Sequence, residues 1–389
     1  MKIIKTFFTV VLFLALVSCN TTNGKPSRIP DGSAAAMVRD MGIGINIGNT
    51  LDAINNHVSN TPAGETGWGN PKITREFIRA LKNYGYTTIR LPVTWAEYLG
   101  PAPNFIIDAE RMNRVEEVVN WILEEDLYCI LNLHHDGGTS PKSWILKAGN
   151  DPQGITRQFA AVWRQIANRF SGSSKKLIFE AMNEVGFDMW NQWAPSTLGK
   201  KPEAYHILNS LNQTFINTVR GTGSNNTDRF LLVSGYWTDI DLTGDPLFIM
   251  PKDIMDNRLI LSVHYYTPAV FCILDKDESW GKNRTDWGTD EDYRELAGQF
   301  AKLKNNFLNR GIPVILGEYG VNFSNKVEAA RTRWIAAVTQ ICLDNGVCPV
   351  FWDTGNDIKR SPESGYAMSN ALSAALRQVI KDHRLEPSQ

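Results

Sequence analysis

The sequence predicts an α/β protein built as a single (β/α)8 barrel, with a catalytic cleft at the carboxyl ends of its strands. Three observations predict this fold: eight short apolar runs, amphipathic segments between them, and polar side chains where the runs end. Continuous apolar strands are buried on both faces, and their alternation with helices indicates a parallel sheet. Eight such units make a closed barrel the first choice.

The predicted elements follow one another from residue 41 onwards. The strands are 41–47, 87–92, 128–133, 177–183, 230–235, 259–265, 313–317 and 347–352, and the helices are 73–84, 109–125, 154–170, 205–220, 290–309, 327–344 and 370–381. Between the fifth and sixth strands, only a turn at 251–255 is a candidate helix. An open doubly wound sheet is the alternative, but the glycines of 42–48 lack the spacing of a nucleotide-binding turn.

The composition is that of an ordinary globular protein. The 389 residues are 43% hydrophobic and 21% charged, and 40 basic against 41 acidic side chains give a net charge of -1. This balance provides no long-range attraction for a phosphate backbone, so we expect no nucleic-acid partner. No linker divides 41–389, which we interpret as one catalytic domain and expect to be monomeric.

The first forty residues predict export and lipid anchoring. Two lysines precede the apolar run 7–17, which is too short to span a bilayer and ends in Leu16-Val17-Ser18-Cys19. We interpret 1–18 as a lipoprotein signal peptide with lipid on Cys19, and 19–40 as a tether and short lead-in. The expected location is the bacterial outer membrane or cell surface, with membrane contact only through the lipid. A plain secretory signal is the alternative.

Four cysteines remain after Cys19 is set aside. Cys342 and Cys348 are six positions apart and could bridge a helix end to the next strand, in a compartment that permits disulfides. Cys129 lies inside an apolar strand, where a buried free thiol is expected.

Polar side chains recur where the predicted strands end. Asp136 or Asp353 alone could be a helix cap. Six strands that end in costly side chains indicate a functional site, because a buried charge without a partner is expensive. The set includes Asn49, Arg90, His134, His135, Asn183, Glu184, His264, Tyr266, Glu318 and Trp352.

The two glutamates of this set indicate glycoside hydrolysis. One carboxyl can protonate the leaving oxygen while the other attacks the sugar or activates water. Arg90 and Tyr266 are suited to keep one carboxylate ionised, and His264 can tune the carboxyl that must start protonated.

These residues stand in motifs that resemble glycoside hydrolase family 5. The motifs are Ile89-Arg90-Leu91-Pro92, Asn132-Leu133-His134-His135-Asp136, the segment 177–184 ending in Asn183-Glu184, His264-Tyr265-Tyr266, Gly317-Glu318-Tyr319-Gly320 and Phe351-Trp352. Within the family, 44–52 and 67–71, which contains Trp68, are similar to subfamily 4, of endoglucanases and xyloglucanases. The resemblance covers residues 41 to about 382.

The resemblance implies a retaining endo-β-1,4-glucanase. Glu184 would be the acid/base and Glu318 the nucleophile, with their carboxyl groups ~5–5.5 Å apart. Substrate and supporting contacts would come from Arg90, His134, His135, Asn183, His264, Tyr266, Trp352, Asn49 and Trp68, with Trp352 under the sugar in subsite -1. The family usually has Gly at Ala181 and often Pro at Val185, so the path of the loop that follows is left open.

The expected substrate is a β-1,4-glucan such as cellulose, mixed-linkage glucan or xyloglucan. A β-mannanase of the same fold and a non-catalytic glycan-binding lipoprotein are the alternatives. We expect no cofactor and no metal, because a metal hydrolase typically places two histidines at i and i+2, whereas His134 and His135 are adjacent and predicted to face apart.

The 12 tryptophans are unusually many. Trp121, Trp163 and Trp334 fall inside helices and are predicted to pack against the barrel. Flat indoles stack well on the apolar faces of sugar rings, so the remaining nine are candidates for an aromatic cleft. They are Trp68, Trp95, Trp144, Trp190, Trp193, Trp237, Trp280, Trp287 and Trp352.

Overall fold

Eight parallel strands pair in chain order and close into a barrel in the computed structural model, which describes residues 32–55, 61–138 and 140–385. This confirms the predicted (β/α)8 architecture. The predicted signal peptide, Cys19 and most of the predicted tether lie outside the described residues. The strands are β1 (Gly44–Ile47), β2 (Thr88–Leu91), β3 (Tyr128–Asn132), β4 (Leu177–Glu180), β5 (Leu231–Ser234), β6 (Leu259–Tyr265), β7 (Val314–Tyr319) and β8 (Cys348–Asp353).

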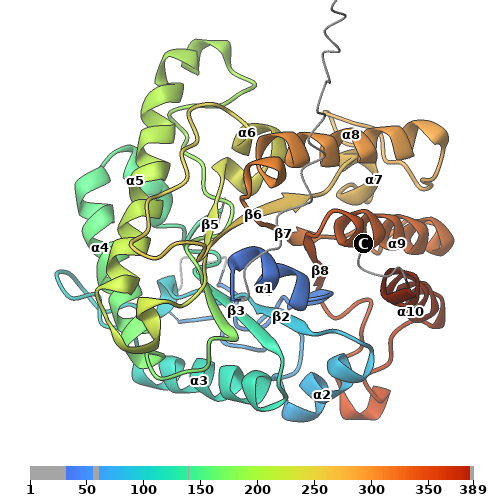
Figure 1. The fold of residues 1–389 in the computed structure, drawn as a ribbon, viewed down its shortest axis with the longest axis horizontal. Coiled ribbons are helices and arrows are strands. Elements are labelled where there is room, and N and C mark those ends of the chain that lie inside the picture. Colours follow the sequence, from blue (N-terminus) through green and yellow to red (C-terminus); the bar gives the residue numbers. More distant parts are fainter. Residues whose placement is uncertain (1–31, 56–60, 139, 386–389) are drawn as a thin grey trace, which may run out of the picture.

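Helices surround the barrel as an outer ring (Figure 1). The seven predicted helices are all present, and side-chain caps define the start of several of them; Thr289 and Asp292 form a full capping box, for example. The ring consists of α2 (Arg75–Asn83), α3 (Ala109–Glu124), α4 (Pro152–Arg169), α5 (Lys201–Arg220), α8 (Asp290–Asn306), α9 (Glu328–Asp344) and α10 (Asn370–Leu385). Two short helices, α6 (Ile240–Thr243) and α7 (Ala269–Cys272), lie in loops after β5 and β6.

Two local predictions were wrong. The candidate helix at 251–255 is not helical; the short helix between β5 and β6 is α6, which begins where Asp239 accepts a hydrogen bond from the Leu242 amide. The lead-in 19–40 contains an unpredicted helix, α1 (Ala34–Asp40), capped by Ser33. Its two buried apolar side chains, Ala34 and Val38, pack in one cluster with residues of distant strands, which is why the sequence pattern did not reveal it.

The interior of the barrel is arranged in layers. Ala34 and Val38 of α1 cover the amino-terminal end, and pack with an apolar layer of strand residues that includes Ile178, Ile260 and Ile315. Figure 1 shows α1 lying across this end of the barrel. The next inward-facing positions towards the carboxyl ends are polar and buried: Asn46, Arg90, Asn132, Glu180 and Ser262. The catalytic-end side chains therefore stand on a polar layer, which itself rests on an apolar one.

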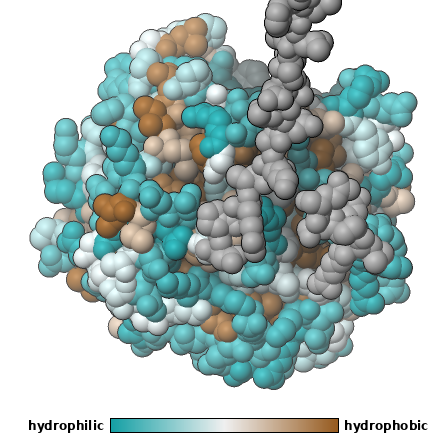
Figure 2. All heavy atoms as spheres, viewed as in Figure 1, coloured by the Kyte–Doolittle hydropathy of each residue, from teal (hydrophilic) through white to brown (hydrophobic). Residues whose placement is uncertain are grey.

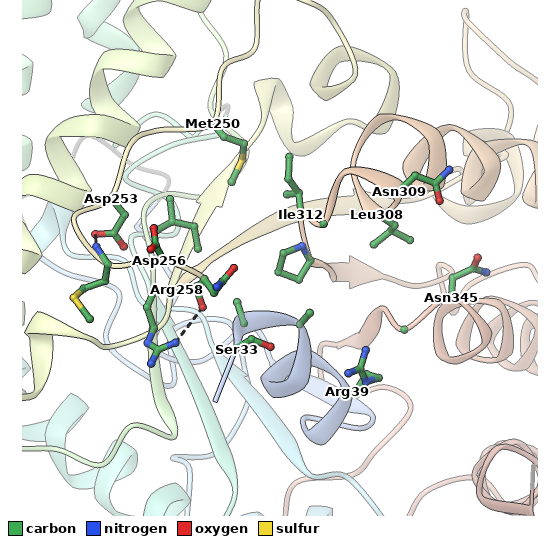
Figure 3. A pocket seen from close by; sticks show the side chains of 18 residues that line it. Ser33, Arg39, Met250, Asp253, Asp256, Arg258, Leu308, Asn309, Ile312 and Asn345 are labelled. Carbon is green, nitrogen blue, oxygen red and sulfur yellow. Dashed lines mark hydrogen bonds between the residues drawn. The ribbon is translucent and has the colours of Figure 1, made fainter. Parts of the chain in front are cut away.

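A large cavity lies at the amino-terminal end, away from the two glutamates. It has a volume of about 910 Å³ and is lined by α1 residues and by residues that precede β6, β7 and β8. Figure 3 shows Ser33, Arg39, Asp253 and Arg258 around it. In Figure 2 the same face is mainly hydrophilic, with apolar side chains scattered over it. Size alone thus does not locate the catalytic cleft in this protein.

The described cysteines are all buried and free, Cys342 and Cys348 included. Burial raises the pKa of the Cys348 thiol to about 12, so this thiol is protonated and unreactive at neutral pH. Among the described helices, none is long and apolar enough to cross a membrane.

Candidate active site

Glu184 and Glu318 face each other at the carboxyl ends of the strands. Carboxylate oxygens of the two glutamates and a ring nitrogen of His264 all lie within 4.8 Å of one another. Glu318 is almost fully buried, whereas the Glu184 side chain is 38% exposed. The arrangement thus contains one enclosed carboxylate and one that is accessible from the cleft.

A β-bulge in β7 turns Glu318 into the barrel mouth. Ile315 belongs to the interior layer, so regular alternation would point residue 318 outward, towards the helices. The register with β6 shifts at this point, from Val263 opposite Leu316 to His264 opposite Glu318. Gly317 is the extra residue, and the bulge re-aims the side chain that follows it.

Gly317 is required at the bulge because there is no room for a side chain. A Cβ atom at this position would lie 2.6 Å from Ser262 Oγ and 3.2 Å from His264 Nε2. The Gly317 carbonyl accepts a hydrogen bond from Asn46 Nδ2 at 2.9 Å, which holds the bulge from the side of β1. The position of Glu318 therefore depends on β1 and β6 as well as on its own strand, β7.

Glu184 is held by the loop after β4 in an unusual backbone conformation. Its φ of 43° is left-handed, which is uncommon for a residue with a side chain and is found at functional sites. The Glu184 carbonyl accepts from the Gly138 amide, and the Val185 carbonyl accepts from the Trp237 amide. A Cβ on Gly186 would come within 2.1 Å of Trp237 Nε1. The close approach of this indole explains why position 186 is a glycine, and these contacts show the loop path that the sequence left open.

Arg90 is the centre of the hydrogen-bond network below the glutamates. It is fully buried and donates from Nη1 to Glu318 Oε1 at 2.7 Å and from Nη2 to Asn183 Oδ1 at 2.7 Å. Its Nε donates to Glu180 Oε2 at 2.6 Å. The Tyr266 hydroxyl donates to Glu318 Oε2 at 3.0 Å. The contacts from Arg90 and Tyr266 to Glu318 are as predicted.

Glu180 lies in the hydrogen-bond network of the site, and the sequence analysis did not single it out. It is fully buried, and besides Arg90 it accepts hydrogen bonds from Ser262 Oγ at 2.7 Å and Asn132 Nδ2 at 3.1 Å. A sequence signal was present: a charged side chain two positions after Ile178 must face the barrel interior with it.

His264 lies between the two glutamates. Its Nδ1 is 2.9 Å from Glu184 Oε1 and 3.5 Å from Glu318 Oε2. The expected contact with the more exposed carboxyl is therefore present. If Nδ1 accepts in this contact, Glu184 carries the proton; if Nδ1 donates, Glu184 is ionised.

The pKa values of the two carboxyls are coupled through these contacts. Burial raises the pKa of Glu318, assisted by the charge of Glu184 and opposed by His264 and Arg90. Burial also acts to raise the pKa of Glu184, but a hydrogen bond donated by His264 brings it below its usual range. The charge of each carboxyl therefore affects the ionisation of the other, and the hydrogen bond with His264 acts on Glu184 directly.

The sequence analysis expected His134 and His135 to face apart, and this expectation was wrong. Their ring centroids are 4.6 Å apart, because β3 ends at Asn132 and strand alternation no longer applies. His134 stacks on Trp352, with 5.5 Å between centroids and 8° between planes. His135 lies 5.4 Å from the Trp68 ring. Burial lowers the pKa of both histidines, which keeps them neutral near pH 7.

Asp52 completes a group of possible metal ligands with these two histidines, their ligand atoms lying within 4.8 Å of one another. Its carboxylate already accepts the backbone amides of Asn49 and Thr50, at 3.0 and 2.7 Å. These two hydrogen bonds explain the buried acid without an ion. They also shape the turn that carries Asn49, whose φ of 58° is left-handed.

The tryptophans divide differently from the prediction. Trp163 and Trp334 are fully buried as expected, and Trp121 is half-buried beneath Arg114. Four of the nine predicted cleft residues are buried anchors and cannot stack on a sugar: Trp95, Trp144, Trp190 and Trp287. Their Nε1 or ring contacts are internal, as in the hydrogen bond from Trp144 to Asp136. The five that keep accessible surface are Trp68, Trp193, Trp237, Trp280 and Trp352.

A pocket of about 480 Å³ opens beside Glu184. The accessible rings of Trp193 and Trp237 line it, together with the carboxylates of Asp188 and Asp239. Trp193 is 84% exposed, the largest exposed fraction among the large apolar side chains of the described residues. Glu318 does not line this pocket, so the two glutamates have different access to it.

Fold and site together define a glycoside hydrolase with a (β/α)8 barrel. The family model for cellulase, glycosyl hydrolase family 5, matches residues 51–358. The chain therefore belongs to glycosyl hydrolase family 5, as its motifs predict.

Related proteins cover most of the chain. Endoglucanase A of Paenibacillus barcinonensis is 36% identical over 368 residues, covering 89% of this chain and 88% of that protein. A xyloglucan-specific endo-beta-1,4-glucanase of Bacteroides ovatus is 32% identical over 357 residues, covering 86% and 68%. The solved structure of a GH5-4 broad specificity endoglucanase from Ruminococcus champanellensis with bound cellotriose aligns with a TM-score of 0.79 at 32% identity, covering 90% and 99%.

The bulge makes Gly317 a test of how Glu318 is positioned. Gly317→Ala is expected to displace Ser262 or Glu318 and to reduce kcat/KM about tenfold or more, since small misplacements of a reacting group are costly. Gly298→Ala in α8 is the matched control, because its added Cβ meets no atom within 4 Å. Steady-state kinetics with a thermal unfolding scan measures both variants. Wild-type kinetics in Gly317→Ala would contradict the role of the bulge.

Proposed function

We propose that this protein is a retaining endo-β-1,4-glucanase that cleaves internal bonds of β-1,4-linked glucans. The observation that carries the proposal is the pair of glutamates: one buried beside Arg90 and Tyr266, the other open to the cleft. Oxygens less than 4.8 Å apart suit a carboxyl spacing of ~5–5.5 Å, which leaves no room for a water molecule between Glu318 and the anomeric carbon. The relatives named as endoglucanases and a xyloglucanase support the same substrate class.

Glu318 acts as the nucleophile in this proposal. Its carboxylate attacks the anomeric carbon while the bond from that carbon to the leaving oxygen breaks. Arg90 and Tyr266 hold the carboxylate in place through two hydrogen bonds to different oxygens. Burial and the neighbouring glutamate raise the pKa of the Tyr266 hydroxyl well above its usual value, so it stays protonated as a donor.

Glu184 acts as the acid and then as the base. It transfers its proton to the leaving oxygen as the glycosidic bond breaks, and His264 as an Nδ1 acceptor keeps that proton on Glu184 beforehand. In the second step the Glu184 carboxylate removes a proton from water. The water oxygen bonds to the anomeric carbon, and the bond to Glu318 breaks. Two inversions restore the original anomeric configuration.

We propose that aromatic side chains along the cleft bind successive sugar rings of the glucan. Trp352, stacked on His134, is proposed as the floor of subsite -1, and Asn183 as the partner of the sugar 2-hydroxyl. A Cβ on Gly48 would lie 2.9 Å from the Trp352 ring, so the glycine makes room for this floor. Asn49, Trp68 and His135 extend the glycone side. The pocket beside Glu184 is proposed to receive the leaving-group side of the chain.

A β-mannanase of the same fold is the alternative within this mechanism. We expect initial rates on carboxymethyl cellulose, mixed-linkage glucan or xyloglucan to exceed the rate on β-mannan at least about tenfold. The physical reason is that an axial 2-hydroxyl would lose the Asn183 contact, and a missed hydrogen bond to a polar site is costly. A reducing-end assay over the four polysaccharides measures this. A higher rate on mannan would reverse the substrate class, and no hydrolysis of any would favour a binding protein.

The assignment of the nucleophile makes a separate prediction. Glu318→Ala should reduce turnover by about 10⁵-fold or more, and azide should partly restore it by forming a glycosyl azide. Glu184→Ala should instead respond to azide with the opposite anomer, because its nucleophile is intact. Proton NMR of the products distinguishes the two and reports the anomer that wild type releases first. An inverted first product, or an active Glu318→Ala, would contradict the mechanism.

We also propose that the protein is a monomeric lipoprotein, anchored through Cys19 at the outer membrane or cell surface. The described chain begins at Gly32, beside α1, at the end of the barrel opposite the glutamates. A tether from Cys19 to this end would leave the cleft directed away from the membrane. At ~5–6 Å × √n, its reach is roughly 20 Å.

The anchoring proposal predicts that mutation of Cys19 changes the cell fraction in which the protein is found. Cys19→Ala should move the protein from the membrane fraction to the soluble fraction of the cell envelope, with unchanged kinetics in detergent-free assays. Fractionation with immunoblotting measures this, and Ser18→Ala, which keeps the lipidated residue, is the matched control. Equal membrane association of Cys19→Ala and wild type would contradict lipid anchoring.

A further inference from the structure

The polar layer under the active site contains a carboxylate to which no role has been given. We propose that Glu180 is a positioning residue, which orients Arg90 and offsets its charge so that Glu318 keeps an unneutralised negative charge. The inference rests on the proposed role of Glu318 as nucleophile and extends it by one residue.

The first argument is geometric. Glu180 Oε2 accepts from Arg90 Nε at 2.6 Å, and this contact fixes the plane of the guanidinium group. With the plane fixed, Nη1 points at Glu318 and Nη2 at Asn183, at 2.7 Å each. Ser262 and Asn132 in turn hold Glu180 by hydrogen bonds. Glu180 thus controls the direction of two contacts that it does not itself make.

The second argument is electrostatic. If Arg90 faced Glu318 alone, the nucleophile would be half of a neutral ion pair. Because Glu180 is the second carboxylate on the same guanidinium, the group of three has a net charge of -1 when both acids are ionised. The remaining negative charge lies next to the place where positive charge develops on the sugar. Fixed charges of this kind stabilise a transition state without reorganisation.

The third argument is burial. The side chains of Arg90 and Glu180 are both 0% exposed, and a buried ion pair contributes little to stability compared with apolar residues of similar volume. The apolar layer below Glu180 shows that this barrel can fill its interior without charge. A buried charge retained directly below the reacting groups is therefore better explained by the chemistry than by folding.

The other charged and titratable groups around Glu318 set the background for a test. Arg90 faces it from β2, Glu184 from the loop after β4, His264 from β6 and Tyr266 from the residue directly after β6. Removing the charge of Glu180 leaves all of these in place. Loss of one negative charge makes ionisation of Glu318 easier, so the acid limb of the pH profile moves to lower pH.

The decisive experiment compares Glu180→Gln with wild type over the full pH range. We expect the acid limb of kcat/KM to move down on the order of one pH unit, and kcat to fall at least about tenfold with KM changed less than about threefold. Glu180→Asp keeps the charge, so its acid limb should stay at the wild-type pH even if stability falls. Asp136→Asn, which removes a buried carboxylate bonded to Trp95 and Trp144, is the matched control and should not shift the limb.

Ser262→Ala keeps the proposal testable if Glu180→Gln does not fold. It removes one donor from Glu180, leaves that charge less compensated, and should move the acid limb slightly to higher pH, opposite to Glu180→Gln. A structural role alone predicts lower thermal stability and no movement of the acid limb in either variant; that result would overturn the proposal.

A labelling experiment separates the role of Glu180 from the role of Glu318 as nucleophile. Wild type is treated with a 2-deoxy-2-fluoro glycosyl inactivator, which is expected to label Glu318. Absence of labelling counts against Glu318 as the nucleophile. Labelling of wild type together with an unshifted acid limb in Glu180→Gln counts only against the positioning role of Glu180.

Discussion

The buried guanidinium of Arg90 is the interaction on which the arrangement of the site depends. It joins β2 to β4 through Glu180, to the loop after β4 through Asn183, to β7 through Glu318 and to β1 through Asn46. A charge in this position is tolerable only if every donor is satisfied, because an unpaired buried charge is very costly. The requirement couples four separate parts of the chain and places Glu318 and Asn183 relative to each other.

Two departures from regular backbone geometry determine the direction of the two glutamate side chains. The bulge at Gly317 reverses the side of the strand on which residue 318 lies, and the left-handed conformation of Glu184 turns its side chain towards His264. Each departure is supported by neighbours: Asn46 and Ser262 at the bulge, Gly138 and Trp237 at the loop. Local strain of this kind persists only where the surrounding structure determines it. Rigid placement of two carboxyls is what double displacement needs, since their separation sets the stereochemical result.

Sequence reasoning was most successful where the physical signal is local. Strand and helix periodicity predicted all eight strands and the seven longer helices, and the motifs located Arg90, Tyr266 and both glutamates. It was wrong for α1, which is stabilised by contacts with the far end of the barrel, and for the relation of His134 to His135, because β3 ends before them. It also overestimated the aromatic cleft. A tryptophan after a strand can point inward as an anchor or outward as a platform, and Trp95 and Trp193 show both outcomes.

The sequence by itself determined the class of the fold, the family and the residue types of the site, because hydrophobic period and the cost of burying polar groups act within short segments. Only the tertiary structure decided which carboxylates share Arg90, that Gly317 is a bulge, and which five of the nine candidate cleft tryptophans remain accessible. These features arise between strands that are distant in the chain. Glu180 and Glu318 are 138 positions apart in the chain, and they contact the same guanidinium group only because the barrel closes.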